Sequence, residues 1–419
     1  MTLTASLTRV MPPGAVAADR ESGAWAWLGA VPEAVVRPRS TAEVASVLSW
    51  ASAQGMSVVP VGSGRHALAD RVDAPFVVLS TERMTGIQAY EPADLTFTAL
   101  AGTTLRELDG VLAAHAQWIP VDPPLRPERT VGGLAAAGLS GPLWMGYGEI
   151  RNHVLGMTLV RGDGQVLRLG GGVVKNVAGF DLLKPVVGSR GTLGVVTSVC
   201  MRTFPVPATD RVLALRAERT SALVPAARAV CTAPVLPVSV VLLAPAPPRA
   251  AGAALVVRLH GAADTVAADQ ASLEEHAGVS FDRVEPTRAD ALLAAVRDHG
   301  AQAPVVLRMS VLPSRLSEAL AAIEALGGPG GESTPLVHVD AYAGRVRVGL
   351  PAKGTDVAGI AASLRATAET LGGALGVERR PAGLPLDGAA TAPSDDERAL
   401  GLGLRRVFDP EGVLWHRHR

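Results

Sequence analysis

The 419-residue chain is poor in the residue types on which several protein classes depend. Its 2 cysteines, Cys200 and Cys231, are too few for a disulfide scaffold or a metal cage, and their apolar contexts predict buried, reduced thiols. A formal net charge of +0 argues against a general nucleic-acid binder. No basic segment leads into an apolar one at the N-terminus, and no apolar run reaches bilayer-spanning length. We therefore expect a cytoplasmic protein without a transmembrane segment, whose membrane association, if any, is peripheral and through partners.

Lysine and aromatic residues are also scarce. The lysines are Lys175, Lys184 and Lys353, so arginine supplies nearly all positive charge, and aromatic residues make up 4% of the chain. A hydrophobic content of 48% still suffices for a large core, which Ala, Val and Leu must fill. Because 419 residues exceed one usual domain, we expect two, residues 1–205 and residues 206–419.

The first half is predicted to be α+β, with small sheets and long loops. Capping boxes at Ser40–Glu43 and Thr104–Glu107 predict helices that run to about Gln54 and about His115. The other predicted elements are strands at 57–61, 76–79 and 94–99, a short helix at 131–137, and a hairpin of 154–160 and 166–169 that turns at Gly162-Asp163-Gly164.

From about Pro205 onwards, alanine-rich helices alternate with strands, which predicts an antiparallel sheet covered by helices. The expected helices are 221–233, 265–277, 288–299, 314–326, 355–371 and a last helix at 397–408. The expected strands are 211–216, 238–243, 254–259, 305–311 and 337–348.

Glycine, by contrast, is abundant between Pro120 and Phe204, too densely for a packed core and too regularly for a linker. Glycine is costly in regular structure and is kept where the backbone takes positive φ or approaches something closely. We therefore expect one large anionic ligand to lie against this backbone and to account for the whole set.

The segment Gly62-Ser63-Gly64-Arg65-His66-Ala67 fits the pattern G-x-G-x-x-A after a strand. A Rossmann site would require a long helix next, but Asp70, Asp73 and Pro75 leave room for about one turn. A loop whose successive backbone N–H groups form an anion nest for a diphosphate fits better. A simple tight turn is the alternative.

Several motifs in sequence then resemble a known family. They are Arg37-Pro38, Ser40-Thr41-Ala42-Glu43-Val44, Gly62–His66, Asp94-Leu95-Thr96, Ala101-Gly102-Thr103-Thr104, Thr130-Val131-Gly132-Gly133-Leu134, Tyr147–Gly156 and Gly188–Thr197. Together they resemble the PCMH-type FAD-binding domain of the vanillyl-alcohol-oxidase flavoproteins. Val174–Asp181, with the strands at 308–313 and 339–345, is similar to the smaller FAD-binding subunits of bacterial glycolate oxidases.

This resemblance implies a two-lobed FAD-binding domain followed by an α+β substrate or cap domain. It implies that two separated turns, Gly62–His66 and the Gly132-Gly133 turn, converge on one diphosphate, and that Val195 and Val196 lie near the adenine. The implied FAD-binding residues are Gly62, Ser63, Gly64, Arg65, His66, Pro123, Thr130, Gly132, Gly133, Gly138, Ser140, Gly141, Tyr147, Gly148, Arg151, Val154, Lys175, Gly194, Val195 and Val196.

Two residues near the expected cofactor, Lys175 and His66, have alternative roles. Lys175 could balance phosphate or reduced-flavin charge, or could form a surface salt bridge. His66 could be joined covalently to the flavin, as in some relatives, or could be a non-covalent neighbour of the cofactor. A register shift of one residue would put Arg65 at that point instead.

Polar residues in the second half are the candidates for the substrate site. Arg258 and Arg308 interrupt apolar strands, where an unpaired charge is costly, so one of them could clamp a substrate carboxylate, or both could form interface ion pairs. His338, Asp340 and Tyr342 fall on one strand face by period two and could form either a proton-abstracting face or a solvated one. No metal site is expected.

The resemblance implies oxidation of a 2-hydroxy acid such as glycolate or D-lactate, with electrons passed to a partner. The partners implied are a larger flavin subunit and an iron–sulfur subunit, since this chain lacks the cysteines for a cluster. The chain lacks the histidine cluster around Gly-Asp-Gly-Asn of relatives that act alone, and Trp415-His416-Arg417 replaces the usual Asn-Pro-Gly near the C-terminus. An oxygen-using oxidase of a sugar, polyol or lactone and a non-catalytic scaffold subunit are therefore the alternative functions.

Overall fold

The structure is a computed structural model. It describes residues 3–17, 25, 28–64, 72, 75–171, 181–245, 252–326, 335–352, 354–381, 383–386 and 388–415. Arg65, His66 and Lys175, three of the predicted cofactor residues, lie outside the described residues.

The chain begins with a small sheet of strand order β1–β2–β4–β3, in which β2 and β3 are both parallel to β4. The Ser40 side chain caps the following helix by accepting a hydrogen bond from the Glu43 N–H at 3.2 Å, which is one half of the predicted capping box. The other half is wrong, because the Glu43 carboxylate accepts a hydrogen bond from the Arg39 N–H at 2.8 Å and not from that of Ser40. The elements of this part are α1 Leu3–Val10, β1 Val16–Ala17, β2 Ala34–Val36, α2 Thr41–Gln54, β3 Ser57–Val61 and β4 Phe76–Ser80.

A five-stranded antiparallel sheet of order β5–β6–β10–β8–β9 follows. Leucines of α3 and α4 pack on one face of it, while Val160 and Val195 on the other side share a core with α2. The elements are β5 Ile87–Glu91, β6 Thr96–Leu100, α3 Leu105–Leu112, α4 Val131–Ala137, α5 Trp144–Tyr147, β8 Val154–Val160, β9 Val166–Gly170, α6 Leu183–Val186 and β10 Val195–Arg202, with the short pair β7 Gln117–Trp118 and β11 Phe204–Pro205.

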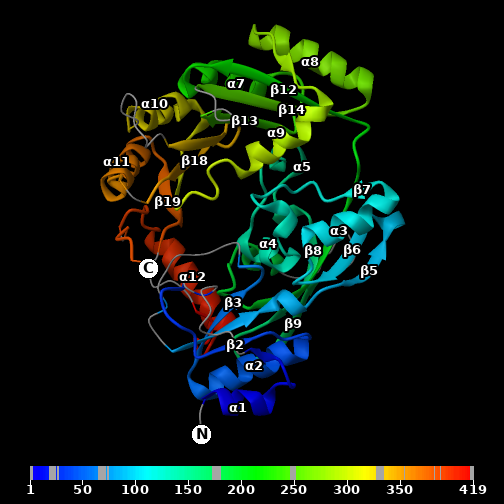
Figure 1. The fold of residues 1–419 in the computed structure, drawn as a ribbon, viewed down its shortest axis with the longest axis vertical. Helices are drawn as coiled ribbons and strands as arrows, with labels where there is room; N and C mark the ends of the chain where they lie inside the picture. The colour runs from blue at the N-terminus through cyan, green and yellow to red at the C-terminus, as the bar shows by residue number, and fades with distance from the viewer. Residues whose placement is uncertain are drawn as a thin grey trace.

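The second half forms one eight-stranded antiparallel sheet of order β15–β12–β14–β13–β17–β18–β16–β19, drawn in the upper part of Figure 1. Its strands are β12 Thr209–Ala217, β13 Ser239–Ala244, β14 Ala253–Gly261, β15 Asp282–Arg283, β16 Val305–Ser310, β17 Leu336–Asp340, β18 Arg345–Leu350 and β19 Ala374–Arg379. Its helices are α7 Thr220–Thr232, α8 Ala263–Ala277, α9 Pro286–Asp298, α10 Leu316–Leu326 and α11 Val357–Thr370. The prediction of an antiparallel sheet covered by helices is confirmed.

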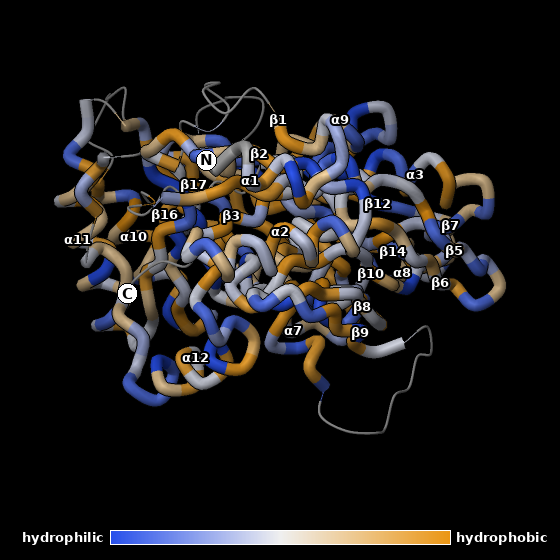
Figure 2. The backbone as a smooth tube through the Cα atoms, turned by 90° about the horizontal axis from the view of Figure 1, so that it is seen from below, coloured by the Kyte–Doolittle hydropathy of each residue, from blue (hydrophilic) through white to orange (hydrophobic). Residues whose placement is uncertain are grey.

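The two faces of this large sheet differ in character. Apolar side chains of α7, α8, α10 and α11 pack against one face in the largest core of the molecule. On the other face, α9 covers the β12–β14–β13 end. At the β17–β18–β16–β19 end the same face carries polar side chains, because residues alternate between the two faces of each strand. Figure 2 shows that hydrophobic segments follow strands and helices through the interior, whereas the connecting loops are mostly hydrophilic.

The sequence prediction of one strand over 337–348 is wrong. The chain makes a tight turn at residues 341–344, which separates β17 from β18. Gly344 has φ +65°, and the Asp340 carboxylate accepts a hydrogen bond from the Ala343 N–H at 3.1 Å, which closes the turn. Tyr342 therefore lies at the turn, 49% exposed, and does not share a strand face with His338 and Asp340.

The C-terminal segment returns to the first half of the molecule. After α12 Asp395–Phe408, the side chains of Val413 and Leu414 are buried in the core that contains α2, and Leu414 forms an isolated parallel bridge with Val58 of β3. Figure 1 shows α12 (red) running from the β19 side of the large sheet towards β3. The domain boundary at residue 205 remains a prediction. The C-terminal residues Val413 and Leu414, which that boundary assigns to the second domain, pack into the core of the first half. Among the described helices, none has the length and apolar character needed to cross a bilayer.

One buried histidine generates a prediction on acid stability. His153 is fully buried beside Phe204, and burial together with the nearby Arg202 guanidinium lowers its pKa from 6.5 to about 4, although the Gly148 carbonyl oxygen, 3.2 Å from Nε2, opposes the shift. Between these values the unfolded chain binds a proton that the folded chain does not. Stability should therefore fall by ~3 kcal/mol as pH drops from 6.5 to 4.

Denaturant midpoints measured across this pH range would check the prediction. His153→Gln should flatten the acid limb, because glutamine does not titrate, whereas the exposed control His276→Gln should retain it. Identical pH profiles for His153→Gln and the unmodified chain would contradict the assignment.

Candidate functional site

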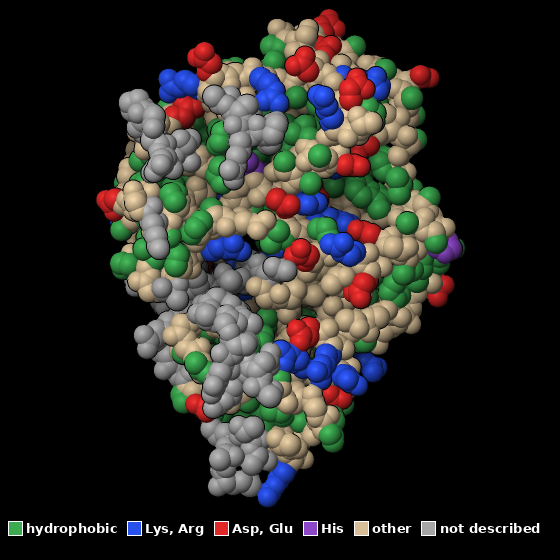
Figure 3. All heavy atoms as spheres, in the orientation of Figure 1, with side chains coloured by type: hydrophobic (Ala, Val, Ile, Leu, Met, Phe, Trp, Pro, Cys, Tyr) green, Lys and Arg blue, Asp and Glu red, His purple; other side chains and the backbone are tan. Residues whose placement is uncertain are grey.

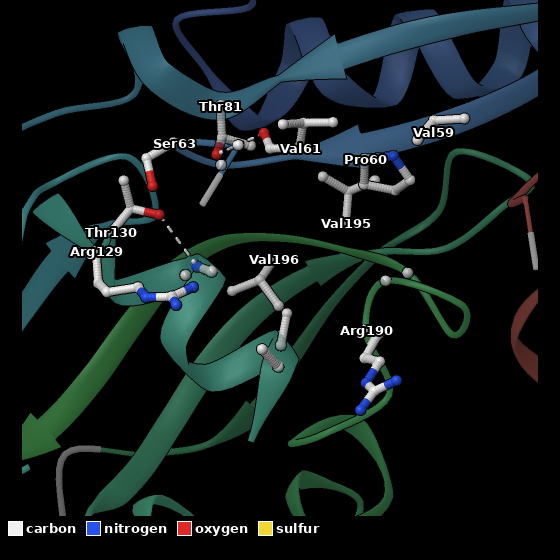
Figure 4. Close-up of a pocket in the computed structure, with 18 of the residues that line it drawn as sticks. Val59, Pro60, Val61, Ser63, Thr81, Arg129, Thr130, Arg190, Val195 and Val196 are labelled. Atoms are coloured by element: carbon white, nitrogen blue, oxygen red, sulfur yellow. Dashed lines mark hydrogen bonds between the residues drawn. The ribbon is translucent and has the colours of Figure 1, made fainter. Parts of the chain in front are cut away.

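A cavity in the first half lies between the loop after β3, the start of α4, and the segment that leads into β10. We call it the glycine cavity; protein atoms leave about 940 Å³ there, open solvent included. Figure 4 shows Ser63 and Thr130 at one end and Val59, Pro60 and Val195 at the other. Its lining residues are Val59, Pro60, Val61, Gly62, Ser63, Gly64, Thr81, Arg129, Thr130, Gly132, Gly133, Ala136, Ala137, Arg190, Gly191, Gly194, Val195, Val196 and Trp415.

The two predicted glycine turns meet in this cavity. A Cβ atom on Gly62 would stand 2.6 Å from Thr130 Oγ1, so only glycine allows the loop to approach α4 this closely. Within the described residues, the backbone N–H groups of Gly62, Ser63 and Gly64 have no protein acceptor. Consecutive free N–H groups at one end of a cavity are what an anion nest requires.

The second turn, Gly132-Gly133, differs from the first because its backbone N–H groups already have acceptors. The N–H groups of Val131 and Gly132 donate to the carbonyl oxygens of Thr103 and Ala101, both at 2.9 Å, and that of Gly133 donates to Thr130 Oγ1 at 3.3 Å. The start of α4 thus supplies close backbone approach and shape, while the 62–64 loop supplies hydrogen-bond donors.

The expectation that one ligand accounts for all of the glycines between Pro120 and Phe204 is wrong. Gly146 packs against Val238, where an added Cβ would lie 2.7 Å from the Val238 Cα atom. Gly162 packs against the Asp409 carboxylate in the same way. These positions require glycine because other parts of the protein touch their backbone. A high frequency of glycine therefore indicates tight packing of the protein against itself as well as close approach of a ligand.

A second, strongly basic cleft adjoins the glycine cavity. We call it the arginine cleft; Arg129, Ala137 and Arg190 line both sites. Its charged lining residues are Arg129, Arg190, Arg297, Arg308, Arg345, Arg347, Arg379, Glu149, Asp340 and Glu378, which is seven arginines against three carboxylates. Figure 3 shows Lys and Arg side chains (blue) gathered with a few acidic ones beside a hollow between the upper and lower parts of the molecule.

The centre of the arginine cleft is a row of polar side chains across three strands. Arg347 of β18 stands directly opposite Arg308 of β16 on one side and His338 of β17 on the other. Glu378 of β19 serves both arginines, at 3.1 Å from Arg347 Nε and 3.8 Å from Arg308 Nε. Two like charges directly opposite each other are destabilising. Within the described parts of the chain, the Glu378 carboxylate is the one ion-pair partner of these two arginines and balances half of their charge.

His338 is the buried member of this row. It is 7% exposed, and its Nε2 atom has no hydrogen-bond partner in the described part of the chain. Burial, followed by the charges of Arg347 and His299, holds the pKa of His338 well below its ordinary value, so the imidazole is neutral at physiological pH. A neutral ring with a free nitrogen in a cleft can accept a proton or a hydrogen bond.

Asp340 shares this face but is already engaged. Its carboxylate accepts hydrogen bonds from the Trp144 indole and from the Ala343 N–H, and burial raises its pKa. Arg345, opposite Asp340 in the next strand, reaches Glu149 of the first half at 3.0 Å. These contacts join the large sheet to the first half along one side of the arginine cleft.

Other predicted residues lie away from both sites. Arg258 forms a bidentate ion pair with Asp210, which agrees with the alternative that this arginine has an ion-pairing role. Of Arg258 and Arg308, only Arg308 lines the arginine cleft. The Tyr147 hydroxyl lies 2.7 Å from His260 Nδ1 and thereby links the two halves.

The remaining predicted cofactor residues form two groups. Gly138, Ser140 and Gly141 line the arginine cleft, next to the glycine cavity. Pro123, Gly148, Arg151 and Val154 line neither site. Arg151 instead pairs with Glu149 at 3.2 Å. The cofactor roles of these residues remain predictions.

Several residues of the two sites were missed in the sequence. Arg129 and Arg190 stand at the junction of the sites, and Arg190 has φ +57°, a backbone conformation that non-glycine residues rarely adopt. The alternation Arg345-Val346-Arg347 is a signal that could have indicated a basic strand face. In the sequence, Trp415 is only the first residue of the departure from the family pattern near the C-terminus, without a role in a site.

Comparisons with known proteins agree with this geometry. Residues 32–170 match the model of the family described as "FAD binding domain". The chain is 43% identical over 134 residues to the glycolate oxidase subunit GlcE of Escherichia coli (32% of this chain, 38% of that protein), and 28% identical over 257 residues to the glycolate oxidase subunit GlcD of Bacillus subtilis (58% and 55%). It is 35% identical over 172 residues to a D-lactate dehydrogenase of Archaeoglobus fulgidus (41% and 38%).

Residues 32–170 are an FAD-binding domain. The matches span between about a third and a little over half of the length of these curated relatives. Among solved structures, a chitooligosaccharide oxidase superposes with a TM-score of 0.74 at 14% identity, covering 99% of this chain and 98% of that chain, which shows a shared fold.

The residues present in the glycine cavity fit FAD. The N–H groups at 62–64, which have no acceptor within the described part of the chain, suit a diphosphate. The small residues at the start of α4 admit close approach, and the valines of β3 and β10 suit a flat apolar ring. The adjoining arginine cleft lies where the cavity continues past Ala137 towards the large sheet.

Gly62 offers a direct test of this cavity. Gly62→Ala places a Cβ atom 2.6 Å from Thr130 Oγ1, so the loop must shift away from α4. We expect FAD affinity to fall about tenfold or more, because the shifted loop loses one or more hydrogen bonds to the charged diphosphate. Titration of the apoprotein with FAD would measure this change.

The matched control is Gly110→Ala in α3, where an added Cβ meets no atom within 4 Å. That variant should bind FAD like the unmodified chain and should unfold no earlier, because alanine favours a helix. Equal FAD affinity in Gly62→Ala and Gly110→Ala would contradict the assignment of the 62–64 loop.

Proposed function

We propose that this chain is an FAD-dependent oxidoreductase that oxidises a 2-hydroxy acid such as glycolate or D-lactate as one subunit of a glycolate-oxidase-type complex. The observation that carries the proposal is the arginine cleft beside an FAD-binding cavity. The names of the relatives, two glycolate oxidase subunits and a D-lactate dehydrogenase, support the same substrate class.

The charge balance of the cleft supports an anionic substrate. Arg308 and Arg347 stand opposite each other and share the single carboxylate of Glu378. A substrate carboxylate would complete the neutralisation, and a planar guanidinium binds a carboxylate through two parallel hydrogen bonds. These two arginines would therefore hold the substrate by its acid group, next to the face that carries His338.

The proposed proton acceptor is His338. When bound, FAD supplies a hydride acceptor for the substrate carbon that carries the hydroxyl group. The residue that takes the hydroxyl proton must be unprotonated beforehand, which for a histidine means a neutral ring, and it must lie at the cleft. His338 is the candidate because the residue lines the cleft, its Nε2 atom has no partner among the described residues, and burial keeps the ring uncharged.

We further propose that electrons leave this chain through partner subunits. Two curated relatives are named as subunits of glycolate oxidase, which suggests a larger flavin subunit as one partner. An iron–sulfur subunit would be the onward acceptor, since two free cysteines cannot hold a cluster. The complex would be cytoplasmic, with any membrane contact made by the partners.

The test is anaerobic reduction of the purified flavoprotein by glycolate and by D-lactate, alone and with co-purified partners. Bleaching of the flavin absorbance by either acid is the expected result. Bleaching only within the complex would favour a scaffold role for this chain. Reoxidation by oxygen at the rate of turnover, with a sugar or lactone as the better substrate, would favour a stand-alone oxidase.

Arg347 tests substrate binding. Arg347→Gln keeps a polar side chain but removes a charged partner of the substrate carboxylate, so kcat/KM for 2-hydroxy acids should fall roughly 10- to 100-fold, mainly through KM. The exposed control Arg315→Gln, whose ion pair with Glu318 is on the surface, should leave kcat/KM unchanged. A KM unaffected by Arg347→Gln would place the acid elsewhere.

His338 tests proton transfer. His338→Gln should lower kcat by roughly 100-fold or more while the affinity for a non-reacting 2-oxo acid stays the same, because only the proton acceptor is lost. Flavin absorbance should be unchanged, which shows that the cofactor site is intact. Full activity in His338→Gln would exclude this residue as the base.

A further inference from the structure

The segment that follows α12 forms one wall of the glycine cavity. Trp415 lines this cavity, and its backbone N–H donates to the Val58 carbonyl oxygen at 2.9 Å. In Figure 4 the C-terminal segment (red) borders the end of the cavity at which Val59 and Pro60 lie. A residue more than two hundred positions away in sequence thus belongs to the same site as the β3 and β10 valines.

This segment is held firmly by buried contacts. The Asp409 carboxylate, 7% exposed, accepts hydrogen bonds from the Val413 and Leu414 N–H groups, each at 2.9 Å. Leu414 is fully buried, and the Val58 N–H donates to the Val413 carbonyl oxygen at 2.8 Å. Trp415 therefore enters the cavity from a fixed backbone, not from a free tail.

The glycine cavity has two chemically different ends. One end holds the N–H groups of Gly62–Gly64, which have no acceptor among the described residues, whereas Val59, Pro60, Val195 and Trp415 provide an apolar and aromatic surface at the other. FAD has the same division, because its diphosphate is anionic and its adenine ring is flat and largely apolar on its faces. Only one orientation of the nucleotide half matches both ends.

We propose that Trp415 contacts the adenine ring of FAD and closes the adenine end of the glycine cavity. The inference rests on the occupancy of this cavity by FAD, and it assigns a cofactor role to a residue outside the matched 32–170 domain. An aromatic side chain against a base contributes through stacking, which is independent of the redox chemistry at the other end of the cofactor.

Binding titrations of the apoprotein test the proposal. Trp415→Ala should weaken FAD about 10- to 100-fold, the range that loss of one aromatic–base contact gives, whereas Trp415→Phe should stay close to the unmodified chain. ADP, which carries the adenine and diphosphate, should lose affinity for Trp415→Ala by the same factor. FMN, which lacks the adenine, should bind all three proteins equally.

Tryptophan emission gives a second measurement that does not depend on the alanine variant folding. ADP should change the emission of the unmodified chain, and this change should vanish in Trp415→Phe but persist in the control Trp118→Phe, whose indole is hydrogen-bonded to the Pro205 carbonyl oxygen outside the cavity. Persistence of the emission change in Trp415→Phe would overturn the proposal. So would a Trp415→Ala variant that binds FAD and ADP as tightly as the unmodified chain does. An unmodified, folded chain that binds no FAD would instead refute the proposed function.

Discussion

The opposition of Arg308 and Arg347 on neighbouring strands, with one glutamate between them, is the constraint on which the arrangement of the second half depends. A sheet can carry such a pair only where its face looks onto a polar cleft, since two guanidinium groups in a closed apolar core would be costly. The opposite face of the same strands is wholly apolar and covered by helices. Because successive side chains of each strand point to opposite faces of the sheet, one face forms the core and the other forms the basic surface of the cleft.

The junction between the two halves follows from the same arrangement. Arg345 reaches Glu149, Asp340 accepts from the Trp144 indole, and Tyr147 contacts His260, so polar side chains of the sheet meet the short helix α5 and its flanks. Polar contacts of this kind fix the orientation of the halves more than they add stability. They place the arginine cleft next to the cavity that fits the cofactor, so a bound substrate and FAD would be neighbours.

Much of the fold could be predicted from the sequence because its signals are local. The N-cap serine Ser40, the capping box at Thr104 and the Gly162–Gly164 turn each specify their element within a few residues. The turn at 341–344 could not be predicted, since Ala341-Tyr342-Ala343 continues the alternation of the strand until Gly344 reverses the chain. The glycine cavity was foreseen from motifs, whereas Trp415 and Arg347 belong to the sites only through long-range packing.

The return of the C-terminal segment to β3 has a consequence for biosynthesis. The lobe that begins with the first strands lacks part of its core until Val413 and Leu414 have been made, and the glycine cavity lacks a wall until Trp415 follows. Domains that emerge early from the ribosome usually fold first, but this one stays incomplete until translation has passed both halves. A cofactor that needs this wall could accordingly be bound only after the C-terminal segment has been synthesised.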